Sequence, residues 1–335
     1  MCWCVPSARG CGCERFRLDG RRCRAQDLAC GKGGDLAKWK EAGIGAYCGI
    51  DIASESVRTD ARLRYNVGHH AFPAALFVAD CFAVPLVHAL LPRGPFDVVS
   101  CQFALHYAFG SEARARRALE NVSSLLRAGG VFLGTTADAN VLVRRVRATR
   151  GLRFGNDLFG CVFSERAAAK TFPADAPFGL EYRFTLADAV ADVPEYLVHR
   201  PTLERLAAEV GLRLVMWRNF HDFVRDRLDV PEDRQLWVSR GLGGVIDDAT
   251  GVAAPPQCVL SPDEWEVAHL YAVFAFRKAR RAPVHAFVVV CLLTHFSVAH
   301  IRRARLARRR ASWASGGCRR APNRAPGCGT STAVT

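Results

Sequence analysis

The chain has 335 residues, 50% of them hydrophobic, which is enough to bury a full core in one large domain or two small ones. Its formal net charge of +14 first suggests a nucleic-acid partner. However, residues 1–26 hold six arginines and two acidic residues, and residues 282–335 hold nine arginines and no acidic residue, so the body between them is nearly neutral. This excludes a uniformly basic body, and any polyanion site there must come from locally placed Lys and Arg.

Residues 1–26 form an atypical N-terminal tail that lacks the long apolar stretch of a secretory signal. Cys2, Cys4, Cys11 and Cys13 lie in it, but no histidine or second close pair completes a zinc site. The body cysteines are widely spaced, mostly in apolar runs where a reduced cysteine acts as a small hydrophobe. We therefore expect a reducing compartment, no disulfide framework and no metal site.

Apolar strand-like runs alternate with amphipathic helical stretches in the body, which predicts an α/β fold with a parallel sheet. A helix is predicted at Glu112–Leu126, and Gly129 and Gly130 are expected to end it. A second helix is predicted at Pro201–Val210. The predicted strands, in chain order, are Tyr47–Ile52, Leu76–Ala79, Phe96–Gln102, Val131–Thr135, Arg213–Trp217 and Tyr271–Arg277.

The segment DLACGKGGD, at Asp27–Asp35, is typical of a nucleotide-binding turn between a strand and a helix. Its glycines lack Cβ and tolerate positive φ, so the backbone can come close to a ligand. Asp51 stands at the tip of the next strand, where a carboxylate can accept hydrogen bonds from both ribose hydroxyls. Rossmann dehydrogenases share this layout, and an ordinary turn remains an alternative for the glycines alone.

Two further strands end in polar side chains. Leu76–Asp80 ends in Asp80, whose carboxylate can accept the amino group of adenine, and the following strand runs into Ser100–Tyr107. Because the carboxyl ends of parallel strands meet at one crevice, we expect these sites to converge. Nothing marks a second mononucleotide half, so the order favours S-adenosylmethionine over a dinucleotide.

Residues 282–335 are predicted to be an atypical, disordered, Arg-rich C-terminal tail. Within it, the apolar run Val284–Ile301 precedes a group of arginines, as in a tail anchor. The run contains three histidines and barely reaches spanning length, so we expect no membrane span. A membrane-tethered protein remains the alternative.

Six segments occur in the same order as similar segments of one family. They are DLACGKGGDLAKW, GIDIA, FDVVSCQFALHYAF, a Gly-Gly strand ending in GTT, VPEYLV and SPDEWEVAHLYAVFAF. From Asp27 to about Lys278 the chain resembles the eukaryotic mRNA cap guanine-N7 methyltransferases. The resemblance implies a Rossmann-like class I methyltransferase at residues 27–281, with a mostly parallel central sheet, flanking helices and a cap-binding elaboration.

The resemblance implies that the cofactor is S-adenosyl-L-methionine and that six residues bind it. Ala29 and Gly31 would lie along its methionine part, where many relatives have Gly in place of Ala29. Asp51 would hold the ribose, and Asp80 would lie by the adenine. Gln102 and Tyr107 would close over the cofactor.

The resemblance also implies a cap site. His106 and Tyr107 would border the guanine, Glu195 would accept protons from guanine N1 and N2, and Tyr271 would form a wall. Three cations, Lys32, Lys38 and Arg64, would meet the triphosphate bridge. The stretch from Asp51 to Arg64 is one residue longer than in relatives.

Each assignment has a simpler alternative. Asp51 could cap the next helix, Glu195 could pair with an arginine and Tyr271 could be core packing. The three cations could be solvated charges, and His106 alone would be read as a core histidine.

The implied reaction transfers a methyl group to N7 of the 5′ guanosine of capped RNA. Guanine N7 is already a nucleophile, so we expect alignment, electrostatic support from Glu195, and no acid–base or covalent catalytic residue. The family implies a nuclear location, capped RNA as partner, a capping-machinery or activating subunit, and no DNA. Another S-adenosylmethionine-dependent methyltransferase and a disabled cap-binding relic remain alternatives.

The chain departs from the family before Asp27. Relatives carry a helix with a cofactor-contacting lysine and then the first strand, and residues 1–26 contain no lysine. Arg24 and Gln26 stand where apolar strand residues belong, which predicts an eroded strand. We expect that the true N-terminal segment is missing and that both tails are misassigned coding sequence.

Overall fold

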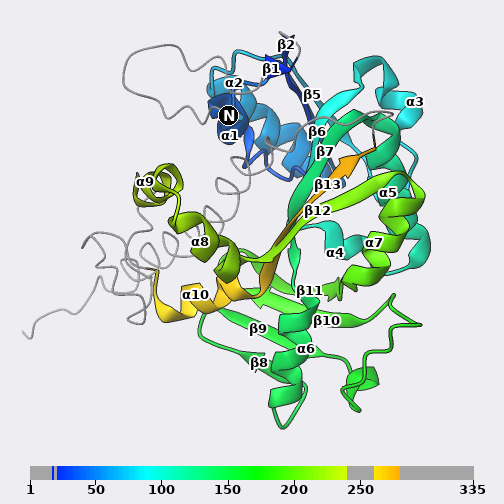
Figure 1. Ribbon diagram of the computed structural model, residues 1–335, viewed down its shortest axis with the longest axis vertical. Coiled ribbons are helices and arrows are strands. Elements are labelled where there is room, and N and C mark those ends of the chain that lie inside the picture. Colours follow the sequence, from blue (N-terminus) through cyan, green and yellow to red (C-terminus); the bar gives the residue numbers. More distant parts are fainter. Residues whose placement is uncertain (1–16, 19–20, 240–259, 280–335) are drawn as a thin grey trace, which may run out of the picture.

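The computed structural model describes residues 17–18, 21–239 and 260–279 (Figure 1). The predictions for Cys2–Cys13, for the apolar run 284–301 and for the C-terminal tail concern residues outside these ranges. The described part contains a seven-stranded sheet, a four-stranded sheet and the short pair β1 (Arg17–Leu18) and β2 (Arg21–Arg22). No described helix is both long and apolar enough to cross a membrane.

The seven-stranded sheet has the order β12-β13-β7-β6-β3-β4-β5. Strands β5, β4, β3, β6 and β7 are parallel, and β13 alone runs against its neighbours β7 and β12. The predicted α/β fold with a mostly parallel sheet is therefore confirmed. The strands are β3 (Arg24–Leu28), β4 (Ala46–Asp51), β5 (Ala74–Val78), β6 (Phe96–Gln102), β7 (Leu126–Ala137), β12 (Leu212–Asn219) and β13 (Tyr271–Lys278).

The prediction of an eroded strand before Asp27 is wrong. Strand β3 pairs with β4 on one side and β6 on the other. Its ladder uses backbone groups, and Ala25 and Gln26 are both fully buried. Arg24 sits at the strand start, where its backbone N–H donates to Asp97 Oδ2 at 2.7 Å. The polar side chain of Gln26 therefore does not prevent β3 from pairing with both of its neighbours.

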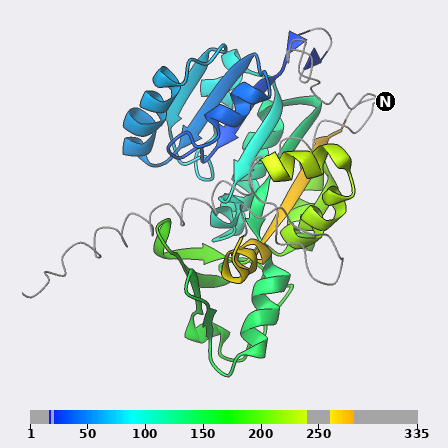
Figure 2. The same ribbon diagram turned by 90° about the vertical axis from the view of Figure 1, so that its left-hand side faces the viewer.

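Helices cover both faces of this sheet (Figures 1 and 2). Adjacent residues of β6 belong to two separate core clusters, Val98 to one and Val99 to the other, because successive side chains point to opposite faces. The helices are α1 (Leu36–Glu41), α2 (Arg62–Val67), α3 (Val87–Leu90), α4 (Leu105–Ala108), α5 (Glu112–Leu125), α6 (Ala139–Ala148), α7 (Arg200–Glu209), α8 (Phe220–Leu228), α9 (Pro231–Ser239) and α10 (Pro262–His269).

The two predicted helices are confirmed as α5 and α7. Ser111 caps α5, since its Oγ accepts from the backbone N–H of Arg114 at 3.4 Å. The expected stop at Gly129 and Gly130 is wrong: α5 ends at Leu125, and β7 begins at the next residue and contains both glycines. Gly129 has a φ of +73°, a backbone conformation that glycine adopts without steric cost.

A second, antiparallel sheet lies between α6 and α7 in the sequence and was not predicted. Its order is β11-β10-β9-β8, and it lies below the seven-stranded sheet in Figure 1. Strand β11 contacts α4, which follows the carboxyl end of β6. This contact brings the four-stranded sheet to the carboxyl edge of the parallel strands, where the cofactor residues are predicted. Its strands are β8 (Arg153–Gly155), β9 (Phe159–Phe163), β10 (Glu181–Leu186) and β11 (Val190–Tyr196).

Candidate active site

The glycine turn after β3 and the tip of β4 are in direct contact. Asp51 Oδ2 accepts a hydrogen bond from the backbone N–H of Gly31 at 2.7 Å, and Oδ1 accepts one from Ala53 N–H at 2.8 Å. The second bond is a turn contact two residues along the chain, and the helical stretch that follows (Ser56–Ala61) has Glu55 as its N-cap without a side-chain cap hydrogen bond, so it does not match the alternative that Asp51 caps the next helix. Each carboxylate oxygen retains an acceptor direction, so this contact leaves room for a ribose hydroxyl.

The turn itself is shaped for close approach. Ala29 and Gly31 have φ angles of +56° and +51°, in the left-handed region. A Cβ built on Gly31 would meet no atom within 4 Å, so open space lies beside its backbone. An alanine at positive φ carries a backbone strain of about 1 kcal/mol, which is typical of ligand-binding turns.

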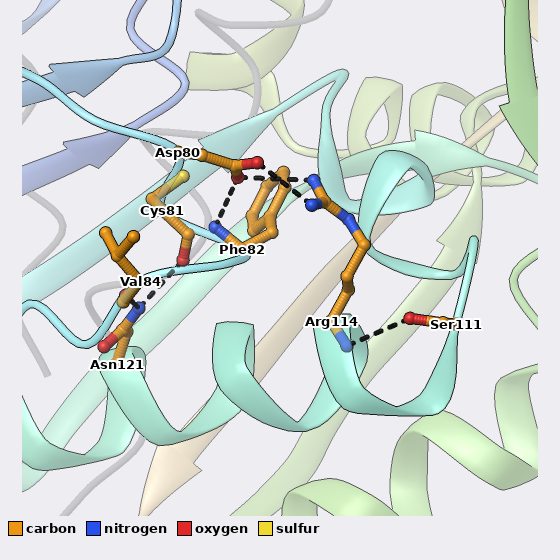
Figure 3. Close-up of polar contacts among 7 residues, drawn as sticks. All are labelled: Asp80, Cys81, Phe82, Val84, Ser111, Arg114 and Asn121. Atoms are coloured by element: carbon orange, nitrogen blue, oxygen red, sulfur yellow. Dashed lines mark hydrogen bonds and ion pairs between the residues drawn. The ribbon is translucent and has the colours of Figure 1, made fainter.

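The turn after β5 places Asp80 at the same edge. Its Oδ1 accepts from Phe82 N–H at 3.0 Å, and its carboxylate forms an ion pair with Arg114 of α5 (Figure 3). The Asp80 side chain is 22% exposed. It is therefore reachable by a ligand while two neighbours hold it.

Strand β6 ends in Gln102, whose Nε2 donates to Ser100 Oγ at 2.9 Å. Its Oε1 is buried and has no hydrogen-bond partner among the described residues. Phe103, the next residue, has a φ of +53°, and its N–H donates to Thr135 Oγ1 at 2.9 Å. A buried unpaired acceptor beside a strained turn is expected where a ligand completes the hydrogen bonding.

These residues fit S-adenosylmethionine, the cofactor that the resemblance implies. The carboxylates of Asp51 and Asp80 suit the ribose hydroxyls and the adenine amino group, which are hydrogen-bond donors. The open space at Gly31 suits the methionine part, and Gln102 Oε1 offers a further acceptor.

The predicted cap residues His106, Tyr107 and Glu195 form one cluster, in which His106 and Glu195 are buried and Tyr107 is half-buried. His106 Nε2 lies 3.4 Å from Glu195 Oε1, and the Tyr107 hydroxyl lies 3.5 Å from the same oxygen. Glu195 is only 4% exposed. The structure thus joins α4 and β11, which lie far apart in the sequence.

Tyr182 of β10 completes this cluster, and sequence reasoning missed it. Its hydroxyl donates to Glu195 Oε2 at 2.7 Å, in register with Glu195 across the β10–β11 pair. The alternation of Tyr182 and Phe184, both buried, with exposed Arg183 was the signal that could have indicated a strand. The alternative that Glu195 pairs with an arginine does not match these partners.

The cluster keeps Glu195 ionised. Burial by itself would raise the pKa of Glu195, but His106 and the hydroxyls of Tyr182 and Tyr107 outweigh it and hold the pKa below the usual 4.5. Burial and the negative charge of Glu195 raise the pKa of Tyr107 and of Tyr182 above the usual 10.0. Both phenols therefore stay protonated and donate to the carboxylate.

Tyr271 packs in the aromatic core, as the alternative proposed, and its role as a wall of the cap site stays a prediction. It is 8% exposed, and its ring stands edge-on to Phe103 and Phe184 at centroid distances of 4.9 and 6.5 Å. Burial, then Glu195, raises the pKa of its phenol. Tyr271 therefore packs between Phe103, in the turn after β6, and Phe184 of β10.

The three predicted phosphate cations lie near the glycine turn and α2, in unequal settings. Lys32 is 62% exposed and pairs with Asp60 at 3.1 Å. The Lys38 side chain is only 11% exposed and pairs with Asp35, so it is not the solvated charge of the alternative reading. Arg64 is half-buried on α2. Their predicted contact with a triphosphate remains a prediction.

Other described groups add no metal site. Among the described residues, no group of three or more His, Cys, Asp or Glu side chains is arranged to hold an ion. The described cysteines of the body, such as Cys48 and Cys81, are free and buried, and burial raises the pKa of each of these two to about 12. Their thiols are therefore uncharged, and they pack as small apolar side chains.

Several curated proteins are similar to the chain over about three quarters of its length. The mRNA cap guanine-N(7) methyltransferase 1 of Oryza sativa subsp. japonica is 49% identical over 264 residues, covering 77% of this chain and 69% of that protein. The protein of the same name from Arabidopsis thaliana is 48% identical over 75% of this chain and 68% of its own length. The mRNA cap guanine-N(7) methyltransferase of Schizosaccharomyces pombe is 37% identical over 75% and 67%.

A solved structure, the CcbJ methyltransferase from Streptomyces caelestis, is similar with a TM-score of 0.47 and 12% identity, covering 77% of this chain and 84% of that one. The family described as the mRNA (guanine-N(7))-methyltransferase domain matches residues 14–279, so the match begins ahead of Asp27 and includes β3. The resemblance stated from the sequence is thus confirmed. The chain belongs to the mRNA (guanine-N(7))-methyltransferase family.

Proposed function

We propose that this protein transfers a methyl group from S-adenosylmethionine to N7 of the 5′ guanosine cap of RNA. The observation that carries the proposal is the buried carboxyl group of Glu195, which lies within 3.5 Å of two tyrosine hydroxyls and of His106 Nε2. Guanine presents N1–H and N2–H donors on one edge, and a fixed carboxylate is their natural acceptor. Family membership independently supports the same activity.

The chemistry needs alignment more than proton transfer. S-adenosylmethionine supplies a methyl group already activated by the positive sulfur. Guanine N7 has a lone pair in the ring plane, so no side chain has to remove a proton from it. Orienting the two reactants accounts for roughly 7–11 kcal/mol of such a barrier. In this chain, Asp51, Asp80 and Gln102 hold one reactant, and the Glu195 cluster holds the other.

Glu195 also contributes electrostatically. Positive charge builds on the purine as N7 is alkylated, and a carboxylate facing N1 and N2 stabilises that charge in a buried, low-dielectric site. Tyr182 and Tyr107 fix the carboxylate before the substrate arrives, so little reorganisation is required. His106 lies against the ring of Tyr107, with centroids 4.3 Å apart, and this contact supports the proposal that both side chains border the guanine.

The test is transfer of labelled methyl from S-adenosylmethionine to GpppG-capped RNA, with uncapped RNA of the same sequence beside it. Glu195→Gln is the variant, and Glu181→Gln, on the partly exposed start of β10, is its matched control. We expect cap-dependent label at N7 that falls by roughly 100-fold or more in Glu195→Gln only. Label on uncapped RNA would indicate a different methyltransferase, and cap binding without transfer would indicate a disabled cap-binding relic.

We further propose a nuclear location and an interaction with the capping machinery or an activating subunit, with no DNA or membrane partner. These follow from the activity, because caps form on nascent transcripts. Imaging of a fluorescent fusion and affinity capture with a capping enzyme test them. A cytoplasmic signal without nuclear enrichment would contradict the location.

A further inference from the structure

The loop that follows β5, from Asp80 to Leu86, is fastened to helix α5 at two points (Figure 3). The first is Asn121, which is 2% exposed. Its Nδ2 donates to the carbonyls of Cys81 and Val84, both at 2.8 Å, and its Oδ1 accepts from Leu86 N–H at 2.9 Å. One side chain thereby fixes the loop backbone at three points.

The second point is the ion pair between Arg114 and Asp80. Arg114 Nη1 donates to Asp80 Oδ2 at 3.0 Å, and Nη2 donates to Oδ1 at 3.3 Å. Two bonds from a planar guanidinium fix the plane of the carboxylate as well as its position. Oδ1 accepts from both Arg114 and Phe82, whereas Oδ2 accepts from Arg114 alone and keeps one acceptor direction.

Helix stability does not explain this arginine. Arg114 is the third residue of α5, where the partial positive charge of the helix terminus disfavours a cation. Its side chain is 37% exposed and that of Asp80 is 22% exposed, and ion pairs exposed to this extent contribute little to stability. The remaining effect of Arg114 is geometric, because its two hydrogen bonds fix the orientation of the Asp80 carboxylate.

We propose that Arg114 is a positioning residue of the cofactor site, which orients Asp80 to accept the 6-amino group of adenine and makes the site selective for adenine. The inference rests on the proposed function, since it assumes that the ligand is an S-adenosyl compound. A 6-amino group donates to the unused acceptor of Oδ2. The carbonyl oxygen of hypoxanthine at the same position would face a carboxylate held in place, and two acceptors repel each other. Without Arg114 the carboxylate can turn away, and that discrimination weakens.

The experiment measures calorimetric binding of two probes to the full chain, S-adenosylhomocysteine and its deaminated analogue S-inosylhomocysteine. The variants are Arg114→Gln and the conservative Arg114→Lys. The matched control is Arg117→Gln, on the same helix, whose arginine is also 37% exposed and pairs with Glu120. Methyl-transfer kinetics on the same proteins separate the KM of each substrate from kcat.

We expect the unchanged protein to prefer the adenine probe by at least about tenfold, as loss of a hydrogen bond to a charged group predicts. In Arg114→Gln the preference should fall below about threefold, with a raised KM for S-adenosylmethionine and unchanged kcat and KM for capped RNA. Arg114→Lys should lie between, because it restores the charge but not the paired bonds. Arg117→Gln should match the unchanged protein.

If Arg114→Gln and Arg117→Gln preferred S-adenosylhomocysteine over S-inosylhomocysteine by the same factor, the inference would be overturned. Equal weakening of both probes in Arg114→Gln would also overturn it, since that marks a general structural role. If the unchanged protein bound neither probe, the proposed function itself would fail. Cofactor binding with normal selectivity but no methyl transfer would contradict the proposed function alone and would leave the test of Arg114 valid.

Discussion

The cofactor edge and the cap cluster both depend on a carboxylate, and they hold it in different ways. Backbone N–H groups of Gly31 and Ala53 hold Asp51, whereas the side chains of Tyr182 and Tyr107 hold Glu195. A backbone donor is present whatever the side chain, but a side-chain donor is lost by one substitution. The hold on Glu195 should therefore be tunable residue by residue, whereas the hold on Asp51 should be lost only when the carboxylate itself is removed.

The largest expected effect on this comparison comes from Asp51→Ala. The change removes the ribose acceptor and leaves Gly31 N–H without its partner, so we expect roughly a 100-fold loss in S-adenosylhomocysteine affinity by calorimetry. The unsatisfied donor should also lower the free energy of unfolding by about 1–3 kcal/mol.

Asp138→Ala separates these two effects. Asp138 is also buried, and its Oδ1 accepts from the backbone N–H of Asn140 at 3.1 Å at the start of α6. It should lose similar stability and keep cofactor affinity. Equal loss of affinity in both variants would mean that Asp51 acts through folding alone.

A smaller effect is expected from Tyr182→Phe. It removes the 2.7 Å hydrogen bond to Glu195 and leaves the ring in place. A hydrogen bond to a charged group contributes about 1.5–3 kcal/mol, so kcat/KM for capped RNA should fall by roughly 10-fold or more. S-adenosylhomocysteine affinity should stay within about twofold. Tyr65→Phe, which removes a hydroxyl donating to the Phe72 carbonyl at 2.6 Å, is the control and should leave cap kinetics unchanged.

The same variant should move the pH profile. The folded-state pKa of Glu195 is lowered below 4.5, so the stability and the ionised acceptor that it contributes are present above that value and are lost as the pH falls through the folded pKa. In Tyr182→Phe, burial is opposed by one donor fewer, so the pKa of Glu195 rises. The acid limb of kcat/KM for capped RNA should then lie at higher pH than in the unchanged protein. Superimposable limbs would show that Tyr182 does not act on Glu195.

The two regions also differed in how far the sequence predicted them. Asp51 is the last residue of β4 and Asp80 follows β5, and parallel strands bring their carboxyl ends to one edge, so local motifs were sufficient to predict these two acceptors, whereas the role of Gln102 came from the resemblance. The cap cluster instead requires the pairing of β10 with β11 and their contact with α4. Strand β11 contains Pro194 and the acidic residues Asp192 and Glu195, residue types that are depleted in strands, so its pattern did not indicate a sheet. Only the family resemblance pointed to Glu195, and Tyr182 had no motif.

Strand β3 illustrates a different failure. Hydrophobic patterning underestimated it because Gln26 is polar, yet its backbone is paired on both sides. Gly129 and Gly130 predicted the end of a helix, because a glycine pair usually ends one, but both lie within strand β7. For β3, pairing with the neighbouring strands overrode the local preference, whereas Gly129 and Gly130 lie in an irregularity of β7 between its paired residues Leu126 and Val131.

The smallest expected effect comes from the lysines that are predicted to contact the triphosphate bridge. Lys32 is mostly exposed, so Lys32→Gln should raise the KM for capped RNA by only about threefold. If Lys32 meets a phosphate, the slope of log(kcat/KM) against log salt should become shallower by about 0.7–1.

Lys38→Gln is the counterpart, because Lys38 is nearly buried against Asp35. Removing its charge leaves Asp35 beside Asp27, whose pKa burial and Asp35 already raise to about 8. We expect a lower melting temperature and an unchanged salt slope. If Lys38→Gln instead flattened the slope while the fold remained stable, its charge would act on the RNA despite its burial. The assignment of phosphate contacts would then pass from the exposed lysine to the buried one.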